Sequence, residues 1–222
     1  MKTFVIPFLI LITISASGQQ LNFNFTKDPV SVANWINVSG DPSSGVRTAT
    51  DQSTGISVSS LATANWYPYS GVSAYDGGGM TSGTFMPATV MVNHWFQHGS
   101  LATYNVSKPQ LELSGLNPAS LYTLKMTGSN IYGFNSNPTR FVVSGSVVSS
   151  HMDVNTYNNT ANGATFSSIM PDANGKIRIY VNTTSDTELA DISGIQLSQQ
   201  AMHSPQMRVQ IIRSRYRQIR LH

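Results

Sequence analysis

The stretch LELSGLNPASLYTLKMTGSN, residues Leu111–Asn130, places a leucine, a proline and a tyrosine ahead of an alternating run. Leu116, Pro118 and Tyr122 in this order are typical of a tyrosine corner. In such a corner a tyrosine near the start of a strand bonds back to the backbone a few residues upstream. We therefore expect the Tyr122 hydroxyl to bond to the backbone near Leu116 or Asn117, and the motif indicates a β-sandwich.

Short alternating runs continue on both sides of this corner. LNFNF (21–25), GISVSS (55–60), ATFSSI (164–169) and KIRIYVN (176–182) all fit strands. Turn-forming clusters such as GDPSSG, NNTANG and PDANG separate them, and DANGK before IRIYV predicts a turn that leads into a strand. The pattern predicts an all-β protein, an antiparallel β-sandwich of jelly-roll type. The region 62–99, rich in Gly, Tyr and Trp, is expected to form loops with short strands.

The length of the strand-like sequence narrows the kind of sandwich. A fibronectin type III domain carries such a corner but has only about 100 residues, whereas strand-like sequence here continues from Tyr122 to Ser198. The segments that follow the corner are TRFVVSG, NTYNNTANGATFSSIMPDANGKIRIYV and ISGIQL, and LNFNF, NWINV and FMPATVMVNHWF precede it. Together they resemble the galactose-binding-like jelly-roll modules of large secreted Bacteroidetes proteins. The resemblance covers most of Leu21–Leu197; modules of this shape often bind glycans, although fold alone does not carry function.

The first eighteen residues predict export. MKTFVIPFLILITISASG begins with Lys2, continues with an apolar run and ends in small residues, as secretory signal peptides do. The run is short for a membrane span, and an uncleaved anchor is the alternative. Cleavage after Gly18 leaves a chain without cysteine. We place the sandwich at residues 19–200, held by its core and located outside the cell or at its surface.

Positive charge is concentrated in the last segment. The chain has 13 basic and 10 acidic residues, and five arginines lie between 208 and 220. Without these and Lys2, 7 basic residues face the 10 acidic ones, which does not favour nucleic-acid binding by the folded body. Residues 201–222 are expected to form a disordered basic tail, with a lipid- or nucleic-acid-binding segment as the alternative. A shifted reading frame of this tail resembles the start of PKD-type repeats, which implies neighbouring domains in a longer parent protein.

Aromatic residues gather in the loop-like stretch NWYPYSGVSAYDGGG, residues 65–79. Aromatic planes stack on sugar rings, and loops at one end of a sandwich commonly carry binding sites. We predict a ligand-binding platform formed by Trp66, Tyr67, Tyr69, Tyr75 and Tyr132. Packing in the core is the alternative for Trp66, and it is favoured for Trp95 and Phe96. Asp76, followed by three glycines, is a candidate for a structural Ca²⁺ site, with a plain turn as the alternative.

The sequence offers no set of residues typical of an enzyme. GDPSSG (40–45) has Pro42 where SGNH esterases carry the nucleophile. The acidic residues lie mostly in turns, which does not favour the facing carboxylates of a glycosidase. We predict a non-catalytic module that binds carbohydrate or adheres to surface glycans, without stable membrane insertion and without a cofactor beyond the possible Ca²⁺. A structural spacer and an accessory domain of a polysaccharide-degrading hydrolase are the alternatives.

Overall fold

The computed structural model describes residues 19–63, 66, 83–98, 109–130, 138–183 and 189–200. Its elements are β1 (Gln20–Thr26), β2 (Ile36–Ser39), β3 (Thr48–Thr50), β4 (Ser57–Ser60), α1 (Ala88–Met91), β5 (Trp95–His98), β6 (Leu111–Ser114), β7 (Tyr122–Thr127), β8 (Thr139–Ser144), β9 (Met152–Val154), β10 (Ala164–Ile169), β11 (Ile177–Thr183), β12 (Leu189–Ile192) and β13 (Gly194–Gln199). The predicted signal peptide and basic tail lie outside the described residues.

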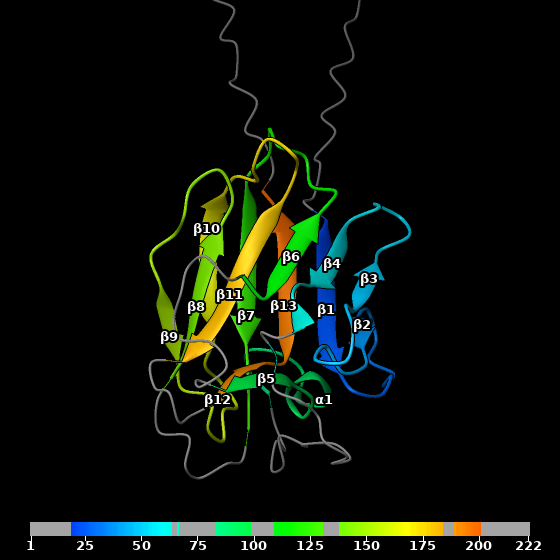
Figure 1. The fold of residues 1–222 in the computed structure, drawn as a ribbon, viewed down its shortest axis with the longest axis vertical. Helices are drawn as coiled ribbons and strands as arrows, with labels where there is room; N and C mark the ends of the chain where they lie inside the picture. Colours follow the sequence, from blue (N-terminus) through cyan, green and yellow to red (C-terminus); the bar gives the residue numbers. More distant parts are fainter. Residues whose placement is uncertain are drawn as a thin grey trace, which may run out of the picture.

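Two sheets pack face to face as a sandwich (Figure 1). One sheet has five strands in the order β10-β7-β13-β1-β2, and the other has six in the order β3-β4-β6-β11-β8-β9. Neighbouring strands are antiparallel except for β1 and β2, which are parallel. The prediction of an all-β antiparallel sandwich is confirmed, while its finer assignment as a jelly roll stays a prediction.

The tyrosine corner forms as the sequence predicts. The Tyr122 hydroxyl accepts a hydrogen bond from the backbone N–H of Asn117 at 3.0 Å. The predicted turn before β11 packs against this corner, because Leu116 N–H donates to the Gly175 carbonyl at 3.1 Å. Gly175 has a φ of 69°, and a Cβ there would lie 2.3 Å from the Leu116 carbonyl oxygen. Only glycine satisfies both the left-handed backbone and this close approach.

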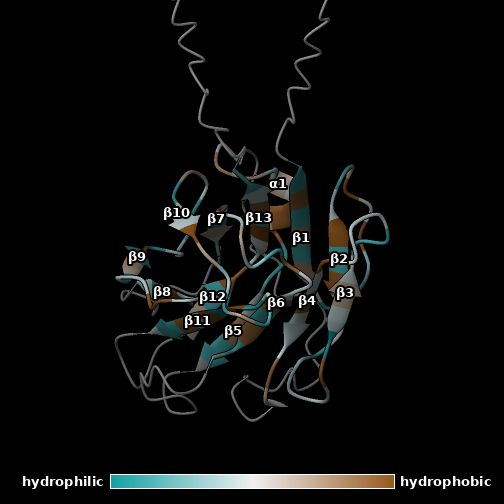
Figure 2. Cartoon of the chain, turned by 90° about the horizontal axis from the view of Figure 1, so that it is seen from above, coloured by the Kyte–Doolittle hydropathy of each residue, from teal (hydrophilic) through white to brown (hydrophobic). Residues whose placement is uncertain are grey.

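The core fills the space between the two sheets with large apolar side chains. Those that are fully buried include Phe23, Phe25, Leu111, Leu113, Leu124, Met126, Phe141 and Ile195. The alternation of β1, visible as bands in Figure 2, would ordinarily leave its asparagines in water. Instead both are buried: Asn22 Nδ2 donates to the Asn34 carbonyl and Asn24 Nδ2 to Asn37 Oδ1, each at 3.0 Å. The connection from β1 to its parallel neighbour β2 therefore covers the second face of β1.

A third, small sheet of β5 and β12 lies with α1 at one end of the sandwich (Figure 1). Trp95 and Phe96 of β5 are buried, as expected for these two residues. Trp95 Nε1 donates to the Thr26 carbonyl at 3.2 Å, and its ring lies 5.0 Å from that of Phe25. The one-turn helix α1 was not expected within 62–99. Pro87 precedes it with φ −54°, a value that suits a helix start.

The sandwich has two distinct ends. Pairing of Gln20 with Ser198 places the first and last described residues together at one end, which we call the terminal end. Thr127, which pairs with Gly194, lies at the opposite end. We call that end the loop end. In the part of the chain that is described, no helix is long and apolar enough to cross a bilayer.

Candidate functional site

A buried polar network fixes the framework of the loop end. Asp191 of β12 is fully buried, and its Oδ2 accepts hydrogen bonds from Asn130 Nδ2 and, at 2.8 Å, from Thr156 Oγ1. The backbone N–H of Asp191 donates to Thr139 Oγ1 of β8 at 2.9 Å. These bonds join β8, β12 and the segments that follow β7 and β9. Buried hydrogen-bonded networks hold their members in one arrangement, so these four residues fix the described strands and connections that carry a surface site.

The connection between β9 and β10 is held in shape by one buried side chain, Asn159. Its Nδ2 donates to Thr127 Oγ1 at 3.0 Å, to the Gly128 carbonyl at 2.9 Å and to the Asn162 carbonyl at 2.8 Å. Its Oδ1 accepts from the backbone N–H groups of Ala161 and Asn162, at 3.2 and 2.8 Å. Both the Nδ2 and the Oδ1 of this amide are thus used in hydrogen bonds that fix the connection.

An open depression of about 530 Å³ lies beside this connection, and we call it the loop-end depression. It is lined by Phe85, Asp153, Val154, Asn155, Ala161, Asn162 and Gly163. The Phe85 ring packs on the backbone of Gly163, where a Cβ would stand only 2.1 Å from Phe85 Cε1. Thr84 N–H donates to the Thr160 carbonyl at 2.8 Å and ties the Phe85 segment to the same connection. The contact with Gly163 and the hydrogen bond of the neighbouring Thr84 therefore hold the Phe85 ring beside the depression.

Asp153 brings a negative charge to the loop-end depression. The guanidinium of Arg140, in β8, donates two hydrogen bonds to this carboxylate: Nε to Oδ1 at 2.7 Å and Nη2 to Oδ2 at 2.6 Å. The hydrogen bonds from Arg140 hold the pKa of Asp153 below its usual value, with smaller contributions from the charges of Arg140 and His151 and an opposing one from burial. The side chain of Asp153 is still 30% exposed. Each carboxylate oxygen thus keeps lone pairs for further donors.

The lining of the depression combines three kinds of groups: an aromatic ring, a carboxylate and side-chain amides. Phe85 supplies an apolar ring face that is half-buried, and Asp153 supplies an acceptor. The exposed amides of Asn155 and Asn162 supply donors and acceptors. Such a set can bind a ligand that has both an apolar face and many hydroxyls. Among the described residues, no group of three or more His, Asp or Glu gathers that would hold a metal ion.

The structure describes one residue of the predicted platform, Trp66. Trp66 is 1% exposed and packs edge-on against Trp95, with ring centroids 5.5 Å apart. It therefore takes the core role that was its alternative and presents no free ring face. The other predicted site residues, Tyr67, Tyr69, Tyr75, Tyr132 and the candidate Ca²⁺ ligand Asp76, lie outside the described residues.

Sequence reasoning missed the residues that line the loop-end depression. Phe85 is a single aromatic residue in TFMP, and its partner Gly163 is far away in the chain. Tyr157, an exposed aromatic of the same connection, was also passed over. The one available signal was NTYNNTANG, whose density of asparagines and turn residues suggests a structured surface connection.

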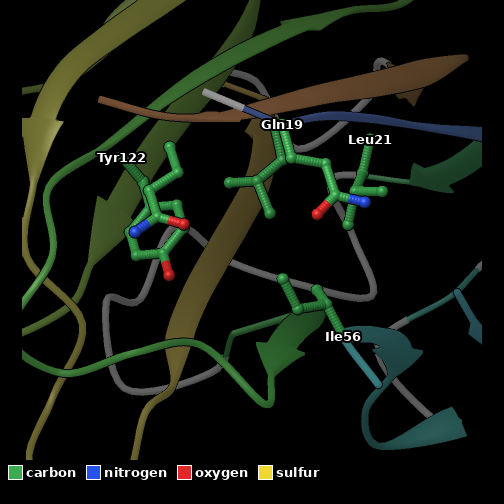
Figure 3. Close-up of a pocket in the computed structure, with 6 residues that line it drawn as sticks. Gln19, Leu21, Ile56 and Tyr122 are labelled. Atoms are coloured by element: carbon green, nitrogen blue, oxygen red, sulfur yellow. The ribbon is translucent and has the colours of Figure 1, made fainter. Parts of the chain in front are cut away.

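A second cavity lies at the terminal end, between the tyrosine corner and the first described residue (Figure 3). Gln19, Leu21, Ile56 and Tyr122 line it together with two residues of β13. Its volume of about 20 Å³ accommodates roughly one water molecule. It is too small for an organic ligand, so the loop-end depression is the better candidate site.

Comparisons with known proteins reveal only distant likenesses. No protein-family model and no curated protein matches the chain. Among solved structures, it is similar to protein YxiM of Bacillus subtilis, with 16% identity over 82% of this chain and 40% of that chain, at a TM-score of 0.47. It is also similar to Bacteroides uniformis beta-glucuronidase 2, with 13% identity over 83% of this chain and 18% of that chain, at a TM-score of 0.40. A third similar structure is the ANXUR1 extracellular domain of Arabidopsis thaliana, with 10% identity over 69% of this chain and 52% of that chain, at a TM-score of 0.39. The chain spans less than two thirds of each.

Proposed function

We propose that this protein is a non-catalytic carbohydrate-binding module of an exported protein and that it holds its ligand in the loop-end depression. The observation that carries the proposal is the Phe85 ring, held by Gly163, which lines the same depression as Asp153, Asn155 and Asn162. A sugar ring presents C–H groups to an aromatic plane and hydroxyls to carboxylate and amide groups at its edge. Neighbouring domains of a longer parent protein would be joined at the terminal end, away from the ligand.

The fixed walls of the depression, as far as they are described, support binding rather than catalysis. Asn159 and the Asp191 network fix the walls of the depression before any ligand arrives. A pre-organised site loses less conformational entropy on binding than a flexible one. Asp153 is engaged by Arg140 in two hydrogen bonds and has a lowered pKa, which suits an acceptor and does not suit a proton donor.

A glycan array probed with the purified full chain tests this function. We expect binding to one class of polysaccharide, with loss of at least about tenfold in affinity for Phe85→Ala, because the stacking face is removed. Val46→Ala is the matched control: Val46 is 60% exposed and lies in the β2–β3 connection, at the opposite edge of both sheets. Circular dichroism must show the wild-type fold for both variants.

Two outcomes would contradict the proposal. If no glycan binds, the chain is better described as a structural spacer. If a glycan binds and Phe85→Ala binds it equally well, the depression is not the site. In that case the predicted tyrosines at 67, 69, 75 and 132 become the next candidates, to be replaced together by alanine.

A further inference from the structure

We infer that the loop-end depression selects uncharged sugars and rejects uronic acids, because the carboxylate of Asp153 lines the depression while the cation that compensates it, Arg140, lies outside the lining. This inference rests on the proposed function and specifies its ligand class. Of the described residues that line the depression, Asp153 is the one that carries a charge. Phe85, Asn155 and Asn162 are neutral, so no lining residue offers a cation to an acidic sugar.

Arg140 fixes the orientation of the Asp153 carboxylate. The guanidinium lies outside the lining of the depression and binds both carboxylate oxygens through Nε and Nη2. A bidentate pair of this kind fixes the plane of the carboxylate. The remaining lone pairs of Oδ1 and Oδ2 are then in a fixed position to accept from two neighbouring hydroxyls of one sugar ring. A sugar carboxylate in the same place would meet like charge instead.

The side-chain amides of Asn155 and Asn162 also favour a ligand with hydroxyl groups. Asn155 Oδ1 accepts from the backbone N–H of Tyr157 at 3.0 Å, which orients this side chain and leaves its Nδ2 to donate. The side-chain amide of Asn162 is exposed. Its backbone is fixed by Asn159, as described above. A pyranose lying on the Phe85 ring would thus have both carboxylate acceptors and amide donors among the residues of the lining.

The test compares one oligosaccharide in two oxidation states. The best uncharged ligand from the array is oxidised at C6 to its uronate, and both forms are titrated into the full chain by calorimetry. We expect the uncharged form to bind at least about tenfold more tightly in 10 mM salt, where the repulsion between a sugar carboxylate and the Asp153 carboxylate in contact with it is least screened. In 1 M salt the difference should shrink, because the uronate gains affinity while the uncharged form does not.

Asp153→Asn gives the sharper result. It keeps an acceptor oxygen, removes the repulsion and leaves the Arg140 charge uncompensated, so we expect uronate binding to improve by about tenfold and uncharged binding to weaken severalfold. Asp41→Asn is the matched control, because it makes the same charge change in the β2–β3 connection, at the far edge of the sandwich. Its ratio of affinities should equal that of the wild type.

The possible results distinguish a failure of the proposed selectivity from a failure of the proposed carbohydrate binding. Equal or tighter binding of the uronate by the wild type overturns the selectivity and leaves carbohydrate binding intact. An unchanged ratio in Asp153→Asn overturns the role of Asp153 in the same way. Failure of the wild type to bind either form overturns both proposals.

Discussion

Single residues at the loop end divide into those that hold the site and those that would touch a ligand. Asn159 is 3% exposed and its side-chain amide is hydrogen-bonded to its neighbours, whereas Asn162, three positions later, is exposed. The two residues are chemically identical and lie in one connection. Substituting each asparagine in turn therefore tests stability and ligand binding separately.

Replacing Asn159 with alanine should lower the free energy of unfolding by about 2 kcal/mol, because buried backbone groups lose their partners. Asn162→Ala should leave that free energy within about 0.5 kcal/mol of the wild type, because the side chain is exposed, yet weaken glycan binding. Urea unfolding monitored by tryptophan fluorescence measures the first effect and calorimetry the second. Equal stability of the two variants would contradict the role given to Asn159.

His94 makes stability depend on pH. It is buried beside Phe96, and burial lowers its pKa to about 4 from the ordinary 6.5. Below pH 6.5 the unfolded chain takes up a proton that the folded chain does not, so stability falls as pH falls from 6.5 towards 4. The loss from this residue between pH 7.5 and pH 5 should be about 2 kcal/mol.

The measurement is urea unfolding of the wild type and of His94→Gln at both pH values. The glutamine variant should lack this part of the pH dependence, whereas His151→Gln, at an exposed position, should retain it. A wild-type free energy of unfolding that stays constant across this range would contradict a buried neutral His94.

At the scale of elements, the start of β10 positions the aromatic ring. Gly163 precedes Ala164, and Phe85 lies directly on it. Gly163→Ala should displace the ring, because its new methyl group would stand 2.1 Å from Phe85 Cε1, and glycan affinity should fall about tenfold without removal of any ligand contact. Gly45→Ala, where the nearest atom is 3.9 Å away, is the control. Unchanged affinity in Gly163→Ala would show that the ring has no part in binding.

The sequence predicts elements well where the cause is local and less well where it is tertiary. Tyr122 and Gly175 were readable because the corner and the turn are each built from a few consecutive residues. The burial of Asn24 was not readable, since it depends on Asn37 and the parallel strand β2. Trp66 stood among loop-like aromatics, and only its packing against Trp95 reveals a core residue. Phe85 depends likewise on a glycine distant in the chain.

At the scale of the whole molecule, the sandwich places its first and last described residues at one end and its candidate site at the other. Gln199 N–H donates to the Gln19 carbonyl at 3.3 Å, so the first and last described residues are neighbours. The depression lies at the far end, beyond Thr127 and Ala164. Domains attached through the terminal end would leave the depression open to a polysaccharide. Under the proposed function, this arrangement would let the module hold its ligand away from the domains attached to it.

The most direct test of this account is to map a bound uncharged oligosaccharide on the ¹⁵N-labelled full chain by NMR. We predict that the amide signals of Asn155, Asn162 and Gly163 shift on titration, while those of Gln20, Tyr122 and Gln199 at the terminal end stay in place. Shifts confined to the terminal end, or no shifts with any glycan that the array selects, would contradict the central claim.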